Sequence, residues 1–129
     1  MRPVLKRILY VEDDSDIRTI TAMALEAVGG FSVIACGSGN EALAAAPDAN
    51  ADLILLDVMM PGMDGLATLS ALRNLSQTAD TPVIFMTAKV QASEIQNYMR
   101  LGVTDVIAKP FDPMTVSAQI GEIWQRVAG

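Results

Sequence analysis

The sequence contains no histidine and only one cysteine. Without histidine, the chain cannot use an imidazole as a general base, and histidine-ligated metal sites are excluded. The single thiol, Cys36, cannot form a disulfide within the chain, and such sparing use of cysteine fits a reducing compartment. Any chemistry must therefore rest on carboxylates, hydroxyls and amines.

Positive charge is also scarce, because 9 Lys and Arg residues face 15 Asp and Glu residues, which gives a net charge of -6. This balance argues against bulk binding of nucleic acid and against an anionic membrane surface. No apolar stretch approaches the length of a membrane span. The basic start of the chain leads into an apolar segment that Glu12 and the next two acids interrupt, which does not fit a signal peptide. We therefore expect a cytoplasmic protein that binds neither nucleic acid nor membrane.

What is abundant is apolar sequence, which makes up 51% of the 129 residues against 19% charged residues. This composition is typical of a folded globular chain and not of a disordered one. The length fits one domain, and no repeat, low-complexity tract or linker divides it. We expect residues 1–129 to form a single domain.

Short apolar runs alternate with stretches in which apolar residues recur at helical spacing. Strands are expected at 8–11, 31–35, 53–56, 83–86 and 105–108. Helices are expected at 17–28, 41–46, 66–75, 95–99 and 116–127, and Pro47 is expected to stop the second. Five alternations of strand and helix predict a parallel sheet with helices on both faces.

The third expected strand carries the most informative pattern. Residues 53–56 form an unbroken apolar run, typical of a strand buried on both faces, and Asp57 ends it. Pro61-Gly62 then breaks the chain, and Asp64-Gly65 is typical of a turn into a helix. An isolated Asp after such a run usually only caps or solubilises the strand, so its importance depends on what else reaches the same edge.

Other groups with chemistry are expected at that edge, because the carboxyl ends of parallel strands lie together. Four of the five expected strands end in such groups: Glu12-Asp13, Asp57, Thr87 and Lys109. Only the second strand, which ends near Cys36-Gly37, contributes no obvious reactive or metal-binding group. If the first and third strands are neighbours, their carboxylates approach and repel each other unless a cation lies among them.

The residue types at this edge favour a site for phosphoryl transfer over ordinary structural roles such as caps and turns. An all-oxygen site with few protein ligands suits Mg²⁺. Together with the ammonium of Lys109 and the hydroxyl of Thr87, it describes a site that stabilises a transferring phosphoryl group. Taken singly, acids at a helix start serve the cap, a Thr after a strand serves a turn, and a Lys before Pro lies on the surface. The hypothesis rests on their shared position at strand ends.

These motifs and their order resemble response-regulator receiver domains of two-component signalling, including the chemotaxis regulators. The matching segments are, in chain order, Val11-Glu12-Asp13-Asp14, the run from Leu56 through Asp57 to Gly65, Thr87-Ala88 and Lys109-Pro110-Phe111. The resemblance covers nearly the whole chain. It implies a flavodoxin-like, doubly wound α/β fold with five parallel strands in the order 2-1-3-4-5 and five helices.

The resemblance also implies roles for single residues. Asp57 would accept a phosphoryl group from a histidine kinase or a histidine phosphotransfer protein. Asp13, Asp57 and the backbone carbonyl of Met59 would bind Mg²⁺, and Glu12 would act mainly through a metal-bound water.

Thr87 and Lys109 would each bind a phosphoryl oxygen, and the Lys109-Pro110 peptide would be cis. Such a protein is not a turnover enzyme, since it catalyses only its own phosphorylation and a slow loss of the phosphoryl group. The phosphorylated form would regulate a downstream protein that the sequence does not name, either as a stand-alone receiver or as a domain of a longer protein. One position departs from the family pattern: Val106 stands where many relatives carry a Tyr or Phe that changes rotamer on activation.

Three alternatives belong to other classes of protein. A flavodoxin-like cofactor-binding protein would share the topology, but its phosphate loops would carry hydroxyls and backbone donors instead of acids. A metal-dependent phosphatase could use the same groups, although the chain has no cap domain to enclose a substrate. A receiver-like interaction module that is never phosphorylated is the third.

Overall fold

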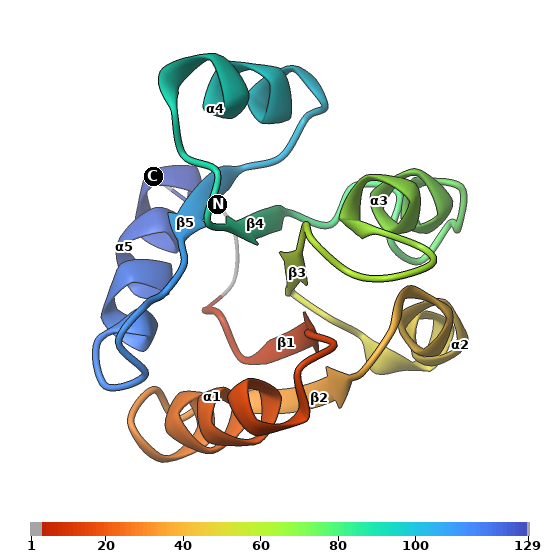
Figure 1. The fold of residues 1–129 in the computed structure, drawn as a ribbon. Coiled ribbons are helices and arrows are strands. Elements are labelled where there is room, and N and C mark those ends of the chain that lie inside the picture. Colours follow the sequence, from red (N-terminus) through yellow and green to blue (C-terminus); the bar gives the residue numbers. More distant parts are fainter. Residues whose placement is uncertain (1–3, 129) are drawn as a thin grey trace.

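The computed structural model describes residues 4–128. Strands and helices alternate along the chain, as the sequence predicts (Figure 1). The strands are β1 (Arg7–Val11), β2 (Ser32–Cys36), β3 (Leu53–Asp57), β4 (Val83–Thr87) and β5 (Asp105–Ala108). The helices are α1 (Ser15–Ala27), α2 (Gly39–Ala49), α3 (Gly65–Arg73), α4 (Ala92–Arg100) and α5 (Val116–Ala128).

The five strands form one parallel sheet in the order β2-β1-β3-β4-β5, which confirms the expected topology. Strand β1 therefore lies between β2 and β3, and Val11 pairs with both Cys36 and Leu56. On the other side of β3, Asp57 pairs with Met86 of β4. This register brings the carboxyl ends of β1, β3 and β4 to one level at a single edge of the sheet.

Helices α1 and α5 cover one face of the sheet, and α2, α3 and α4 cover the other (Figure 1). Alternate residues of each strand serve the two cores. In β1, Ile8 and Tyr10 pack with Leu25 of α1 and Ile120 of α5, whereas Leu9 and Val11 pack with the helices of the other face. Burial on both faces explains why the central strands are unbroken apolar runs.

Side-chain caps fix where three helices begin after the loops at this edge. The carboxylate of Asp14 accepts the backbone N–H groups of Asp16 and Ile17 at the start of α1. Ser38 and Asp64 cap α2 and α3 in the same way. Each cap satisfies backbone donors that the first helical turn leaves unpaired. Asp14 is thus the N-cap of α1.

The expectation that Pro47 stops the second helix is wrong. Helix α2 continues through Pro47 to Ala49 and ends at Asn50, which is left-handed at φ 50°. Proline lacks a backbone donor, but Ala46 packs in the core on this face of the sheet and Ala49 is buried, and this burial outweighs the lost hydrogen bond. The other expected elements are present with boundaries shifted by a few residues.

No helix in the range 4–128 is both long enough and apolar enough to cross a membrane.

Candidate functional site

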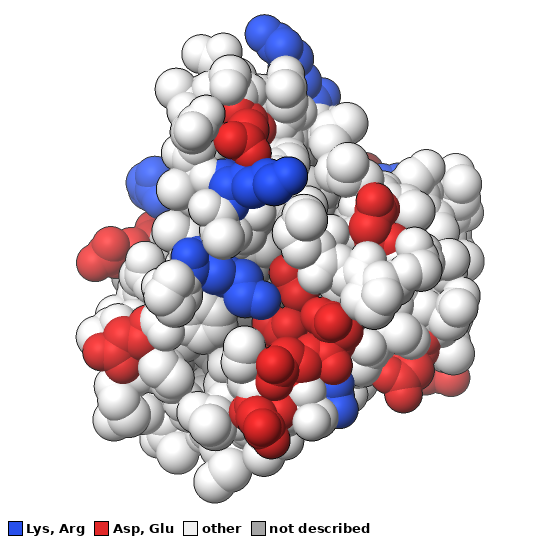
Figure 2. Space-filling view, in the orientation of Figure 1, with Lys and Arg blue, Asp and Glu red and all other residues white. Residues whose placement is uncertain are grey.

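Three carboxylates meet where β1 and β3 end. One side-chain oxygen each of Glu12, Asp13 and Asp57 lies within 4.8 Å of the others. Glu12 and Asp57 are buried, at 1% exposure each, whereas Asp13 is exposed. Figure 2 shows acidic side chains gathered in the middle of this face of the molecule, with cationic side chains beside them. The predicted meeting of the first and third strands is therefore present.

The loop after β3 holds Asp57 closely. The backbone N–H of Met59 donates to Oδ1 of Asp57 at 3.3 Å, and the N–H of Gly65 donates to the carbonyl of Val58. A Cβ at Gly65 would lie 2.6 Å from the carbonyl oxygen of Asp57 and 2.6 Å from Cα of Val58. Only glycine allows α3 to begin so close to the backbone of the strand end.

Burial raises the pKa of Asp57 from 3.8 to about 7. The neighbouring carboxylates of Glu12 and Asp13 add to this rise, and the charge of Lys109 opposes it. A raised pKa means that the surroundings disfavour the charged form of the carboxyl group. In the metal-free site, burial and the two neighbouring carboxylates thus disfavour the ionised form of Asp57.

Lys109 extends from the end of β5 across to this cluster. Its Nζ donates to Oε1 of Glu12 at 2.8 Å and lies 3.4 Å from Oδ2 of Asp57. Burial alone would lower the pKa of Lys109, but the hydrogen bond to Glu12 and the nearby charge of Asp57 outweigh it and raise the pKa. The ammonium is therefore a fixed positive charge at neutral pH. The Lys109-Pro110 peptide is cis, as expected.

Thr87 ends β4 between the strands that carry Asp57 and Lys109. It is fully buried, and its Oγ1 accepts the backbone N–H of Lys89 at 3.0 Å. This contact occupies an acceptor site of the hydroxyl and leaves its O–H to donate elsewhere. The contact also joins the hydroxyl to the loop that leads into α4.

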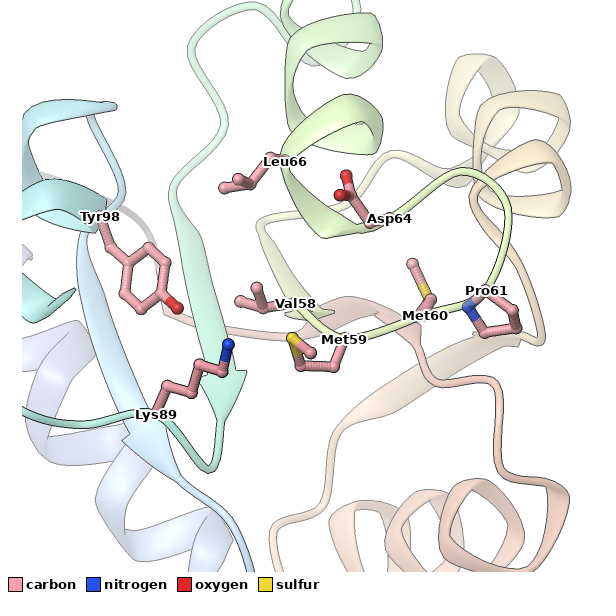
Figure 3. Close-up of a pocket in the computed structure, with 8 residues that line it drawn as sticks. All are labelled: Val58, Met59, Met60, Pro61, Asp64, Leu66, Lys89 and Tyr98. Atoms are coloured by element: carbon pink, nitrogen blue, oxygen red, sulfur yellow. The ribbon is translucent and has the colours of Figure 1, made fainter.

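A cleft of about 480 Å³ opens beside the site, between the β3–α3 loop and α4 (Figure 3). Met59 and Lys89 lie near each other at the cleft, and the hydroxyl of Tyr98 points toward them. The ring of Tyr98 packs edge-on against Phe85 of β4 at 5.4 Å between centroids. Met59 is 56% exposed, so its side chain borders solvent above the strand end.

The sequence patterns missed one residue that contacts the acidic loop. Arg18 of α1 donates from Nη1 to the carbonyl oxygen of Glu12 at 2.8 Å and reaches the carbonyl of Asp13 at 3.5 Å. The signal that could have pointed to it is that Arg18 is the single basic residue of α1 and follows the acidic run closely. It also lies against Gly37, at the strand end that brings no obvious chemistry of its own.

The donor set fits a small divalent cation. All three clustered groups are carboxylates, and hard cations prefer such oxygens. In the described part of the chain, Lys109 forms ion pairs with Glu12 and Asp57, and no ion pair involves Asp13. Negative charge is thus left at the exposed side of the cluster, where a metal could enter from solvent.

Comparisons with known proteins agree with this geometry. Residues 8–121 match the family model for the response regulator receiver domain. The transcriptional regulatory protein CpxR of Escherichia coli (strain K12) is 39% identical over 122 residues, which cover 95% of this chain and 50% of that protein. The transcriptional regulatory protein ResD of Bacillus subtilis (strain 168) is 37% identical over 123 residues, which cover 95% of this chain and 49% of that protein. The chain spans about half the length of these curated relatives.

Among solved structures, the chemotaxis protein CheY4 of Vibrio cholerae superposes with a TM-score of 0.84 at 32% identity. The aligned part covers 93% of this chain and 99% of that chain. The sheet order, the acidic strand ends and the family match all lead to the same result. The chain belongs to the response regulator receiver domains, the phospho-acceptor domains of two-component response regulators.

Proposed function

We propose that Asp57 is the residue of this receiver domain that accepts the phosphoryl group. The observation that carries the proposal is the position of this buried carboxylate, between the ammonium of Lys109 and two further acids. An Oδ of Asp57 attacks the phosphorus of a phosphohistidine, and the P–N bond breaks as the O–P bond forms. The imidazole nitrogen leaves with the electron pair and takes a proton from solvent.

The metal of this proposal is Mg²⁺, which the carboxylates of Asp13 and Asp57 and the backbone carbonyl of Met59 would hold, and Glu12 would contribute mainly through a bound water. When bound, Mg²⁺ supplies positive charge that balances the carboxylates and the phosphoryl oxygens. The support is the cluster of three carboxylates and the raised pKa of Asp57. The exposed carboxylate of Asp13 gives the cluster an open side.

Lys109 and Thr87 stabilise the charge that arrives with the phosphoryl group. The ammonium of Lys109 already lies 3.4 Å from Oδ2 of Asp57, so it can pair with a phosphoryl oxygen on that carboxylate after a small movement. The hydroxyl of Thr87 donates to another oxygen. Phosphorylation adds strong acceptors and negative charge, so both side chains gain charge-assisted hydrogen bonds.

The domain makes one phosphoryl transfer to itself and does not turn over a substrate. The phosphoryl group leaves slowly when a water attacks phosphorus, which breaks the Asp57 O–P bond and releases inorganic phosphate. The donor is a histidine kinase or a histidine phosphotransfer protein, and the phosphorylated domain regulates a downstream protein. We place this reaction in one receiver domain formed by residues 1–129, and we place the domain in the cytoplasm. The free, buried Cys36 is consistent with such a reducing compartment.

The test is the intact mass of the protein after incubation with acetyl phosphate and Mg²⁺. We expect the mass of one phosphoryl group to be added, and the addition should disappear when Mg²⁺ is chelated. Asp57→Asn should abolish it, whereas Asp16→Asn, which removes an exposed acid of the first turn of α1, should not. An unchanged yield in Asp57→Asn would refute the assignment, and a permanently unmodified protein would favour a receiver-like interaction module.

A further inference from the structure

Arg18 contacts the backbone of the acidic loop instead of its carboxylates. The guanidinium donates from Nη1 to the carbonyl oxygen of Glu12 at 2.8 Å, and the carbonyl of Asp13 lies at 3.5 Å. No ion pair joins Arg18 to any residue among those that the structure describes. Its contacts therefore tie the turn between β1 and α1 to the helix that follows.

The turn between β2 and α2 packs against this guanidinium. A Cβ at Gly37 would lie 2.9 Å from Nη1 of Arg18 and 2.9 Å from Oε2 of Glu41, so both groups pack against the bare Cα. The carboxylate of Glu41 accepts the backbone N–H of Gly37. One strand across, the N–H of Glu12 donates to the carbonyl of Cys36 at 3.0 Å. The two turns are thus joined by the backbone hydrogen bond between Glu12 and Cys36 and by the packing of Arg18 against Gly37.

The contacts of Arg18 counteract an effect of the repulsion between the three carboxylates. Glu12 and Asp13 are consecutive, and their carboxylates converge with that of Asp57 within 4.8 Å. Without a cation these groups repel one another, and the exposed Asp13 could relieve the repulsion by moving into solvent. A contact that holds the carbonyls of Glu12 and Asp13 limits that movement and keeps the carboxylates in place before a metal arrives.

Arg18 has two effects on a divalent cation, and they have opposite signs. Its positive charge repels the cation, but solvent screens this repulsion at the exposed edge. Its hydrogen bond to the carbonyl of Glu12 and its longer contact with the carbonyl of Asp13 order the backbone of this turn, which binding of the cation would otherwise have to order. Since the repulsion is screened, the ordering effect should be the larger.

We propose that Arg18 is a positioning residue that raises the affinity of the acidic cluster for Mg²⁺, with Gly37 leaving the space in which its guanidinium lies. The proposal rests on the proposed function, since it assumes that the cluster binds Mg²⁺. It gives the carboxyl end of β2 a part in the site. Arg18 touches neither the metal nor the phosphoryl group in this account, and it acts through the backbone of Glu12 and Asp13.

The test is a Mg²⁺ titration of the unphosphorylated protein, followed by the backbone amide shifts of the loops after β1 and β3. Arg18→Met should weaken Mg²⁺ binding about threefold to tenfold, although it removes a positive charge. Arg100→Met removes an equal charge from exposed α4, remote from the cluster, and should leave the affinity unchanged. In the absence of metal, amide hydrogens of Asp13 and Asp14 should exchange faster in Arg18→Met than in the unchanged protein.

Gly37→Ala keeps every charge, and its Cβ would lie 2.9 Å from both Nη1 of Arg18 and Oε2 of Glu41, so the guanidinium and the Glu41 carboxylate both have to shift. It should also weaken Mg²⁺ binding, and it keeps the test available if Arg18→Met does not fold. An affinity equal to or tighter than that of the unchanged protein, in either folded variant, overturns the proposal. If the unchanged protein itself bound no Mg²⁺, the proposed function would fail, and the two failures are thereby distinguished.

Discussion

Nζ of Lys109 lies 3.4 Å from Oδ2 of Asp57, although Asp57 ends β3, Lys109 follows β5, and β4 lies between these strands. The same ammonium donates to Glu12 at 2.8 Å. The pair places a positive charge beside the proposed acceptor before any phosphoryl group is present. The phosphorylation of Asp57 should therefore depend strongly on this contact.

Replacing Lys109 with Met should slow phosphorylation of Asp57 by acetyl phosphate. A charge-assisted hydrogen bond is worth about 1.5–3 kcal/mol, which corresponds to a rate about 10-fold to 160-fold lower if it is fully formed in the transition state. The rate can be followed by intact mass over time at fixed Mg²⁺. Lys6→Met removes an exposed cation that precedes β1, at the opposite edge of the sheet, and should leave the rate unchanged. Equal rates for Lys109→Met and the unchanged protein would contradict the role of the ammonium.

The stability of the metal-free protein should depend on the pH through Asp57. Its pKa is about 7 in the folded chain and near 3.8 in the unfolded chain. Between these values the unfolded chain releases a proton that the folded chain keeps, so stability should fall as the pH rises from 3.8 to about 7 and then level off.

Thermal unfolding of Asp57→Asn in the presence of a chelator tests this dependence. The variant has no carboxyl group to titrate at this position, so its advantage over the unchanged protein should grow across that pH range and stay constant above it. Asp48→Asn, which changes an exposed carboxylate of α2, should show no such growth. A constant difference between Asp57→Asn and the unchanged protein at every pH would contradict the raised pKa.

Met59 should slow the loss of the phosphoryl group. Its apolar side chain lies two residues after Asp57 and borders the cleft that Lys89 and Tyr98 also line (Figure 3). A bulky apolar group there hinders the water that attacks phosphorus, so Met59→Asn should raise the dephosphorylation rate severalfold. Loss of the phosphoryl mass after removal of the donor measures this rate. The matched control is Met114→Asn, an exposed methionine of the β5–α5 loop; if both variants keep the original rate, Met59 does not gate the water.

The signal should leave the site through the loop between β4 and α4, and Val106 should be nearly passive. Thr87 binds the N–H of Lys89, so a movement of its hydroxyl toward a phosphoryl oxygen pulls on that loop. The loop leads to α4, where Tyr98 packs on Phe85. Val106 pairs with Phe85 in the sheet and has no ring that could turn into a vacated space.

Beryllofluoride with Mg²⁺ mimics the phosphoryl group and allows this route to be followed by amide shifts. The shifts should be large from Thr87 to Tyr98, and Val106→Ala should leave their pattern unchanged. Large remote shifts centred on Val106 and α5, with residues 88–91 unmoved, would show that the signal takes another path.

Much of the fold and of the site was predictable from local patterns. The unbroken apolar run before Asp57 indicates a strand buried on both faces, and the acid, hydroxyl and amine at the other strand ends indicate a shared edge. The structure brings Glu12, Asp13, Asp57 and Lys109 together as that pattern predicts. Strand-end chemistry could be predicted because all parallel strands deliver their carboxyl ends to the same place.

Two features could not be predicted because they depend on packing between distant segments. Proline at position 47 is a local stop signal, and only the burial of Ala46 and Ala49 shows why α2 continues. The contact of Arg18 with the acidic loop requires the bare Cα of Gly37, which lies on another strand end. A pattern within one segment carries no information on such a fit.

The most direct test of the central claim is to locate the phosphoryl group on the chain. After phosphorylation with acetyl phosphate and Mg²⁺, reduction with borohydride converts a phosphorylated aspartate to homoserine, which peptide mass mapping can place. The account predicts homoserine at position 57 and at no other aspartate. Homoserine at Asp13 or another acid, with Asp57 unmodified, would contradict it.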